Sequence, residues 1–155
     1  MLDYELPVPK PKAAHISINK TINGPAQKVC DQWLIPVFVG KWMFGVARGN
    51  EKIISLENKV RKGGRFLFKV TLNGKTIEYS GQYLQMDIPD RLEFSWVSSS
   101  YPDAESLINV QFQETAGKTR LKLTLRLDPR LRKYQDSIKS EWADRCTALA
   151  ARFKK

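Results

Sequence analysis

The stretch that decides the fold of this chain reads RKGGRFLFKVTL, residues 61–72. A basic turn with two glycines leads into a run in which bulky groups recur at every second position, which is typical of a half-buried strand. One face is expected to carry Phe66, Phe68, Val70 and Leu72, and the face toward water Arg65, Leu67, Lys69 and Thr71. The apolar face needs a cover, and that cover either fills the core or leaves a ligand cavity.

Strands are also expected around this run, at about residues 14–22, 51–60, 76–86, 91–97, 105–114 and 119–127. The strongest hairpin signal is Asn73-Gly74, which separates the central run from the strand after it. Pro25 and Pro36 lie where two short helices are expected to begin. Five hairpin-like connections in a row indicate an antiparallel sheet.

The period becomes helical from about residue 131 to residue 153. The apolar stripe of this expected helix comprises Leu131, Tyr134, Ile138, Trp142, Cys146, Leu149 and Phe153. The opposite, polar face is expected to carry Lys133, Asp136, Lys139, Asp144, Arg145 and Arg152. The apolar face of the sheet and the apolar stripe of this amphipathic helix can pack against each other.

The pattern therefore predicts an α+β helix-grip fold, in which a curved antiparallel sheet of about six to seven strands wraps around the long C-terminal helix. Two short helices follow the first strand. Residues 1–12 contain Pro7, Pro9 and Pro11 and are expected to form a flexible Pro-rich tail. Residues 13–155 are expected to form a single domain.

Composition limits the classes of protein. The 155 residues are 42% hydrophobic and 10% aromatic, which is ordinary for a globular core. Net charge is +10, from 26 Lys and Arg against 16 Asp and Glu, and it favours either anionic partners or simple solubility. No apolar run is long enough to span a bilayer, and Met1 to Lys12 lacks the features of a signal peptide. A cytoplasmic protein is expected, with Cys30 and Cys146 as reduced, buried thiols.

Four parts of the sequence carry a resemblance to a known family. They are Pro25-Ala26-Gln27-Lys28-Val29 followed by Trp33 and Trp42, Val60 to Phe66, the two runs Tyr79-Ser80-Gly81-Gln82-Tyr83-Leu84 and Ile88 to Trp96, and the terminal helix with Trp142 and Leu149. Over about residues 14–153 the chain resembles the activator of 90-kDa heat-shock-protein ATPase homologue family, in its C-terminal-domain-like members. That family lies within the START-related, birch-pollen-allergen-like (SRPBCC) helix-grip superfamily.

The resemblance implies a helix-grip fold with no family-wide catalytic motif. The family name links it to chaperone function and stress response. Eukaryotic co-chaperones of this name carry a separate N-terminal domain, whereas this chain has the Pro-rich tail there. Chaperone activation is therefore not part of the expectation.

Three motifs contain residue types that can do chemistry, but each favours a structural role. His15 is the only histidine and has no partner at motif spacing, so neither catalysis nor a zinc site is expected. Asp87, Asp90 and Glu93 fall around a Pro-containing turn, where Asp is favoured for local hydrogen bonding. The run Lys62-Gly63-Gly64-Arg65 lacks the spacing of a phosphate-binding loop. No catalytic residue, metal or cofactor is predicted.

The aromatic residues support the leading functional hypothesis, a non-enzymatic domain that binds a lipid-like or aromatic small molecule between sheet and helix. Tyr79, Tyr83 and Trp142 are expected to orient this ligand. The full set of predicted cavity residues is Trp42, Phe66, Phe68, Tyr79, Tyr83, Phe94, Trp96, Phe112 and Trp142. The alternative reading of the same residues is a filled core.

Two further hypotheses stay open. A protein-interaction or co-chaperone-like module would meet an acidic partner through a basic outer sheet face, formed by Arg65, Lys69, Arg120, Lys122 and Arg126. Little aromatic interleaving accompanies these cations, so no specific nucleic acid is indicated. The third hypothesis is an enzyme resembling the polyketide cyclases of the superfamily.

Overall fold

The computed structural model describes residues 14–44 and 51–154. The expected tail at residues 1–12 lies outside the described residues. Strand β1 (Ala14–Ile22) is followed by helices α1 (Ala26–Leu34) and α2 (Pro36–Trp42). Six strands come next, and their bounds are β2 Lys52–Asn58, β3 Arg65–Leu72, β4 Lys75–Asp87, β5 Arg91–Ser98, β6 Ser106–Thr115 and β7 Lys118–Leu127. The chain then forms the 3-10 helix η2 (Pro129–Tyr134) and the long helix α3 (Gln135–Ala151).

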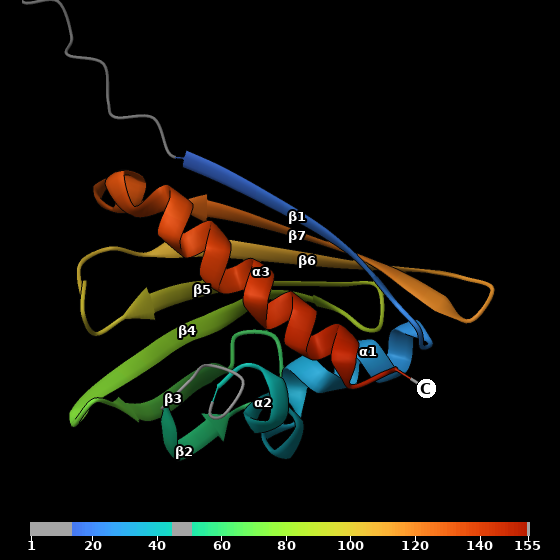
Figure 1. Ribbon diagram of the computed structural model, residues 1–155, viewed down its shortest axis with the longest axis horizontal. Coiled ribbons are helices and arrows are strands. Elements are labelled where there is room, and N and C mark those ends of the chain that lie inside the picture. Colours follow the sequence, from blue (N-terminus) through green and yellow to red (C-terminus); the bar gives the residue numbers. More distant parts are fainter. Residues whose placement is uncertain (1–13, 45–50, 155) are drawn as a thin grey trace, which may run out of the picture.

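The seven strands form one antiparallel sheet in the order β1-β7-β6-β5-β4-β3-β2. Strands β2 to β7 are a meander, since each pairs with the next along the chain. The first strand instead crosses over to pair with the last, with Ala14 opposite Leu127 and Ile22 opposite Thr119. Figure 1 shows the curved sheet with α3 lying diagonally across it and with α1 and α2 toward the C-terminal end of α3.

Strict alternation gives the sheet its single apolar face. On β7 the four leucines at 121, 123, 125 and 127 are buried, whereas Arg120, Lys122 and Arg126 are exposed. The same pattern on β1 buries Ile16 and Ile18 between exposed polar residues. Bulky groups at every second position therefore place one continuous apolar surface under α3, and the expected helix-grip architecture is confirmed.

The C-terminal helix differs from expectation at its start. Residues 129–134 form the 3-10 helix η2 rather than the first turns of α3. Pro129 has no backbone N–H to give to a helix, and the Asp128 carboxylate accepts a hydrogen bond from Arg130 N at 2.9 Å, which caps this tighter turn. The long helix therefore begins at Gln135, and the segment before it forms part of a pocket.

Candidate ligand-binding pocket

A pocket of about 300 Å³ lies between the sheet, the loop from β5 to β6, and the helices η2 and α3. This volume is at the lower end of the range for small-molecule sites, which is about 300–1,000 Å³. The lining residues are Glu51, Leu72, Ile77, Tyr79, Trp96, Ser98, Ser100, Tyr101, Ala104, Ser106, Leu125, Leu127, Leu131, Tyr134, Ser137, Ile138, Glu141, Trp142 and Arg145. The described residues thus outline a concavity of this volume beside the terminal helix.

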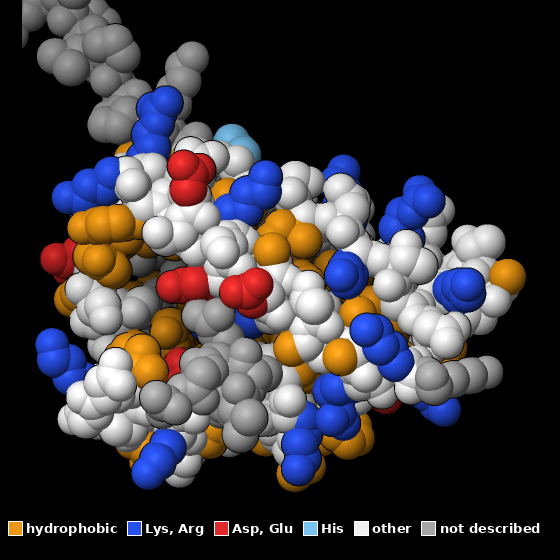
Figure 2. Space-filling view, viewed as in Figure 1, with side chains coloured by type: hydrophobic (Ala, Val, Ile, Leu, Met, Phe, Trp, Pro, Cys, Tyr) orange, Lys and Arg blue, Asp and Glu red, His pale blue; other side chains and the backbone are white. Residues whose placement is uncertain are grey.

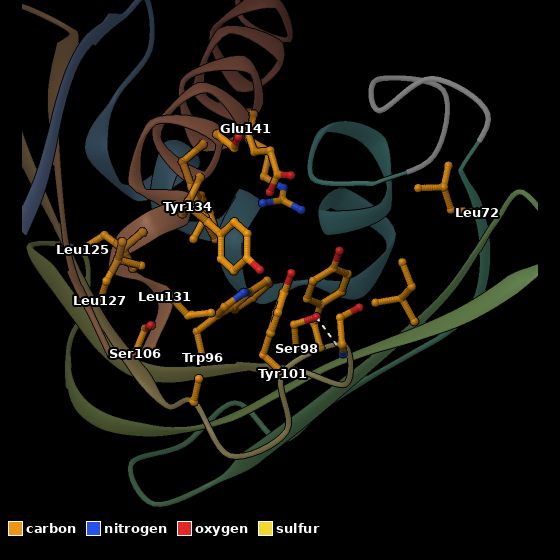
Figure 3. Close-up of a pocket in the computed structure, with 18 of the residues that line it drawn as sticks. Leu72, Trp96, Ser98, Tyr101, Ser106, Leu125, Leu127, Leu131, Tyr134 and Glu141 are labelled. Atoms are coloured by element: carbon orange, nitrogen blue, oxygen red, sulfur yellow. Dashed lines mark hydrogen bonds between the residues drawn. The ribbon is translucent and has the colours of Figure 1, made fainter. Parts of the chain in front are cut away.

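Aliphatic side chains line the pocket on two sides. Figure 3 shows Leu125, Leu127 and Leu131 together on one side and Leu72 on the other, with the aromatic rings in the middle and Glu141 above them. Leu125 and Leu127 come from the end of β7, and Leu131 comes from η2. The 3-10 helix therefore supplies part of this wall. Such a lining, mostly apolar with a few charged groups, is typical of small-molecule sites.

Arg145 lines the pocket and corrects a sequence expectation. The sequence pattern puts it on the polar face of the terminal helix, but its exposed fraction is 1%. Its Nε donates a hydrogen bond to Met43 O at 3.2 Å. The guanidinium lies 4.6 Å from the ring centroid of Trp142, and between 5.6 and 5.9 Å from those of Phe44, Tyr79 and Trp96. Cation–π attraction from several desolvated rings offsets part of the cost of burying this charge.

Three charged side chains act on the Tyr79 hydroxyl at this end of the pocket. Burial is the main cause that raises the pKa of Tyr79 above its usual value of 10.0. The positive charge of Arg145 lowers that pKa, while the negative charges of Glu51 and Glu141 raise it. All three charged residues of the lining therefore lie within electrostatic reach of this one hydroxyl.

Tyr101 and Tyr134 form an aromatic pair at the pocket. Tyr101 belongs to the β5–β6 loop and is 43% exposed, and Tyr134 ends η2. Their ring centroids are 5.2 Å apart. A hydrogen bond between the two hydroxyls raises the pKa of Tyr101 and lowers that of Tyr134. The pair therefore links the loop to the start of the terminal helix.

The structure brings three of the nine predicted cavity residues into the pocket lining, namely Tyr79, Trp96 and Trp142. The other six are buried in the packed core beside it. They are Trp42, Phe66, Phe68, Tyr83, Phe94 and Phe112. Sequence reasoning missed the loop and η2 residues that complete the lining, among them Tyr101 and Tyr134. Much of the aromatic surface is thus core, and the remainder is pocket wall.

Tyr83 illustrates the packed part of the aromatic cluster. Its hydroxyl donates to Asn58 Oδ1 at 2.7 Å, and Asn58 Nδ2 in turn donates to Leu34 O at 2.7 Å. Burial raises the pKa of Tyr83 to about 12, with the hydrogen bond to Asn58 acting in the opposite direction. Through Asn58, the Tyr83 side chain links β4 to β2 and to the end of α1. Its hydroxyl is therefore hydrogen-bonded within the core.

The predicted basic face is divided by the strand order. Arg65 and Lys69 lie on β3, whereas Arg120, Lys122 and Arg126 lie on β7, and the strands β4, β5 and β6 separate the two groups. Lys69 Nζ lies 3.6 Å from a carboxylate oxygen of Glu78. The expected single patch is therefore two groups, of which the one on β7 is the larger.

His15, the acidic turn at residues 87–93 and the double-glycine turn lie outside the pocket lining. His15 is exposed on β1, opposite Arg126. Glu93 accepts hydrogen bonds from Arg91 and from Asn109 on the outer face of the sheet. In the double-glycine turn, Gly63 N donates to Tyr83 O and Gly64 N donates to Arg61 O, each at 2.8 Å. The amides of this turn thus hold the chain to β4 and to itself.

Cys30 and Cys146 are free and buried, and burial raises the pKa of each thiol to about 12. Within residues 14–44 and 51–154, no group of three or more His, Cys, Asp or Glu side chains is arranged to hold a metal ion. None of the helices in these ranges is both long and apolar enough to cross a bilayer.

Solved structures share this architecture. Protein CV1439 from Chromobacterium violaceum superimposes with a TM-score of 0.78 at 16% identity, over 91% of this chain and 97% of that one. Protein NE0264 from Nitrosomonas europaea gives 0.72 at 20% identity, over 88% and 92% of the two chains. An AHSA1-like protein from Aeromonas hydrophila gives 0.69 at 19% identity, over 89% and 93%. At these identities the likeness concerns the fold.

The family follows from the sequence itself. Comparison with curated proteins returned no match. The profile described as "Activator of Hsp90 ATPase homolog 1-like protein" matches residues 23–154, which include both short helices, β2 to β7 and α3. The chain therefore belongs to the Activator of Hsp90 ATPase homolog 1-like family, within the helix-grip superfamily.

Proposed function

We propose that this protein is a non-enzymatic binding domain that holds a small hydrophobic molecule between its sheet and its C-terminal helix. The observation that carries the proposal is the hollow of about 300 Å³, which is lined by aliphatic and aromatic side chains together with the charged residues Glu51, Glu141 and Arg145. Protein cores are normally close-packed, whereas ligand pockets are hollows with mostly apolar walls and a few polar groups. The family and the helix-grip fold are consistent with a ligand-binding domain.

The size of the hollow limits the ligand. At about 300 Å³ it suits a compact aromatic or short-chain compound better than a diacyl lipid. Affinity would come mainly from burial of apolar ligand surface, at about 25 cal/mol per Å² before the cost of association is subtracted. Trp96 and Trp142 would serve as walls, and Tyr79 would orient the polar end.

A titration with the neutral fluorescent probe N-phenyl-1-naphthylamine tests the proposal. Ala104 lines the pocket at 2% exposure, so Ala104→Phe is expected to fill the hollow and weaken probe binding at least about tenfold. Ala151→Phe makes the same change at an exposed position on α3 and should leave binding unchanged. Ile138→Trp is a second blocking variant, placed on the helix side of the pocket.

The outcome separates a pocket from a packed core. Saturable binding that both blocking variants weaken, in protein that keeps its far-ultraviolet circular dichroism spectrum, supports the proposal. Absence of probe binding to the wild-type chain, or equal binding by Ala104→Phe, Ile138→Trp and wild type, would overturn it.

A second candidate function, capture of an acidic protein, is supported by the outer face of β7. Arg120, Lys122 and Arg126 are exposed there. Their cross-strand neighbours on β1 and β6 carry no carboxylate, because these neighbours are Thr21, Asn19, His15, Gln113, Gln111 and Leu107. Three cations in a neutral polar setting attract an acidic surface in a salt-dependent way.

Charge reversal on β7 tests this candidate. The triple variant Arg120→Glu, Lys122→Glu, Arg126→Glu should abolish salt-sensitive capture of an acidic partner. The double variant Arg65→Glu, Lys69→Glu reverses charge on β3 and serves as the control. Equal loss of capture in the triple and the double variant would mean that the net charge of the protein, rather than the β7 group, attracts the partner.

A cytoplasmic location and a polyketide-cyclase-like activity stay predictions of the sequence.

A further inference from the structure

We infer that the segment of residues 2–8 docks on the η2 side of the pocket and competes there with a ligand. The occupant of this surface is thus a part of the same chain. Docking rests on the pocket surface and on the place where β1 begins, and only the competition rests on the binding function proposed above.

The η2 side of the pocket carries apolar surface that is open to water. Tyr101 is 43% exposed, and Leu131, Tyr134 and Ile138 are half-buried, although all four line the pocket. We call these four residues the mouth of the pocket. Figure 2 shows hydrophobic side chains at the left of this face, between η2 and the β5–β6 loop as Figure 1 places them. Exposed apolar groups beside a hollow are typical of a surface that another group covers.

Strand β1 begins next to this mouth. Ala14 pairs with Leu127, which lines the pocket. The His15 carbonyl accepts a hydrogen bond from Gln135 Nε2 at 3.3 Å, and Gln135 directly follows Tyr134 in the chain. Because paired strands lie about 5 Å apart, the residues that precede Ala14 join the sheet beside the pocket wall.

The chain before Ala14 is long enough to return to the mouth. Residues 9–13 form a connection that spans up to about 16 Å when it is extended. The mouth residue Leu131 is only four positions beyond Leu127 in the sequence. Because the connection is short, the effective concentration of residues 2–8 at the mouth is on the order of millimolar, so even weak contacts hold the segment in place.

The sequence of this segment suits an apolar surface. Pro7, Pro9 and Pro11 fix their own φ and bias the residues before them toward an extended backbone. An extended segment loses little conformational entropy when it docks. Its apolar side chains recur at every second position, as in a half-buried strand, and they are Leu2, Tyr4, Leu6 and Val8.

The aromatic pair at the mouth suits the prolines. The ring centroids of Tyr101 and Tyr134 lie 5.2 Å apart, with the ring planes inclined by 39°. Grooves lined by aromatic rings bind Pro-rich extended segments in many recognition domains. Pro7 lies between Leu6 and Val8, so residues 6–8 are the part of the segment best matched to this pair.

Two double variants of the full chain test the docking. Leu6→Ser with Val8→Ser removes two apolar groups, whereas Asp3→Ser with Glu5→Ser changes the polar positions between apolar ones and serves as the matched control. Amide resonances of 15N-labelled protein report on the mouth. We expect the first variant to shift the resonances of η2 and of the β5–β6 loop relative to wild type, and the control to leave them in place.

Titration with N-phenyl-1-naphthylamine tests the competition. A segment that covers the mouth about two thirds of the time raises the apparent dissociation constant of a pocket ligand about threefold, because only the undocked third of the protein binds. We therefore expect the Leu6→Ser, Val8→Ser variant to bind the probe at least about threefold more tightly than wild type. The control variant should bind it as wild type does.

The outcomes separate docking from ligand binding. Unchanged resonances of η2 and the β5–β6 loop in the Leu6→Ser, Val8→Ser variant would overturn docking, and so would equal shifts in the control. A difference from wild type that disappears on dilution would mean that the segment reaches a second copy of the chain, which overturns docking within one molecule. Shifted resonances with unchanged probe affinity would overturn the competition alone. Failure of wild type and of both variants to bind the probe would overturn the binding function and leave docking to stand.

Discussion

Replacing Gly81 with alanine is expected to destabilise this protein strongly. Gly81 lies in β4 directly opposite Phe66 of β3. A Cβ atom at this position would lie 1.9 Å from Ser95 O and 2.5 Å from Phe66 Cζ, whereas ordinary contact begins at 3.4 Å. The backbone of β5 and a buried ring would both have to move, by up to roughly 1.5 Å.

Neither neighbour has room to yield. Ser95 O belongs to a strand held on both sides, and Ser95 Oγ accepts a hydrogen bond from Gln82 N at 2.9 Å. The Phe66 ring is packed among other rings, with the centroid of Phe68 at 4.9 Å and that of Tyr83 at 5.6 Å. Overpacking of a core costs about 1–3 kcal/mol and occasionally more, and we place Gly81→Ala at about 3 kcal/mol or above.

Thermal unfolding followed by circular dichroism measures the effect. For a domain of this size, about 3 kcal/mol corresponds to a fall in Tm of roughly 6–12 °C. Ser80→Ala, the neighbouring change on the outer face, should stay within about 0.5 kcal/mol of wild type. A fall in Tm of less than about 3 °C for Gly81→Ala would refute the steric reasoning, because it would mean that β4 and β5 part easily.

Three other predictions concern buried titratable groups. Cys30 and Cys146 should resist Ellman's reagent in the native protein and react once urea unfolds it, since burial raises the pKa of each thiol to about 12; rapid native labelling would contradict their packing. Tyr83→Phe should lower the free energy of unfolding in urea by about 1–3 kcal/mol, because Asn58 Oδ1 loses its donor. Its affinity for N-phenyl-1-naphthylamine should remain at the wild-type value, and a large loss would return Tyr83 to the ligand site. Between about pH 10 and pH 12 the free energy of unfolding should fall as pH rises, since the folded pKa of Tyr83 is raised from 10.0 to about 12 and the unfolded chain loses that proton first. Urea melts of Tyr83→Phe should show a flatter dependence in that range.

The strands were predictable because they obey the simplest periodicity. On β7 the alternation of leucines with polar groups fixes which face is buried. The expected strand at residues 65–72 agrees with β3 at both ends. The start of α3 was less predictable, because Asp128 and Pro129 favour a 3-10 turn over the first turns of an α-helix.

Arg145 was misplaced because of its residue type, not its position. The residues that α3 buries are Trp142, Arg145, Cys146 and Leu149, which is the spacing i, i+3, i+4, i+7 of a core-facing helix stripe. That spacing was visible in the sequence, but a charged residue is almost never fully buried unless it is compensated. The compensating rings come from α3 itself, β4, β5 and the end of α2, and only the tertiary structure brings them together.

The pocket lining was the least predictable feature. Tyr101 lies in a polar loop and Tyr134 in a segment expected to be regular helix, so neither showed a signal of its own in the sequence. Glu51 directly precedes β2, which is the edge strand opposite β1, and it also lines the pocket. Residues that are distant in sequence line one hollow only because the sheet curves.

The crossover of β1 to β7 determines the order in which the protein can assemble. Strands β2 to β7 can pair one hairpin at a time, with short loops to close. Strand β1 instead pairs with a strand about 100 residues later in the sequence, since Ile22 pairs with Thr119 and Ala14 with Leu127. On the ribosome, this apolar strand is synthesised before the meander and can be placed only after β7 has emerged. During that interval its alternating isoleucines stay exposed, and the open edge of the nascent sheet is vulnerable to aggregation.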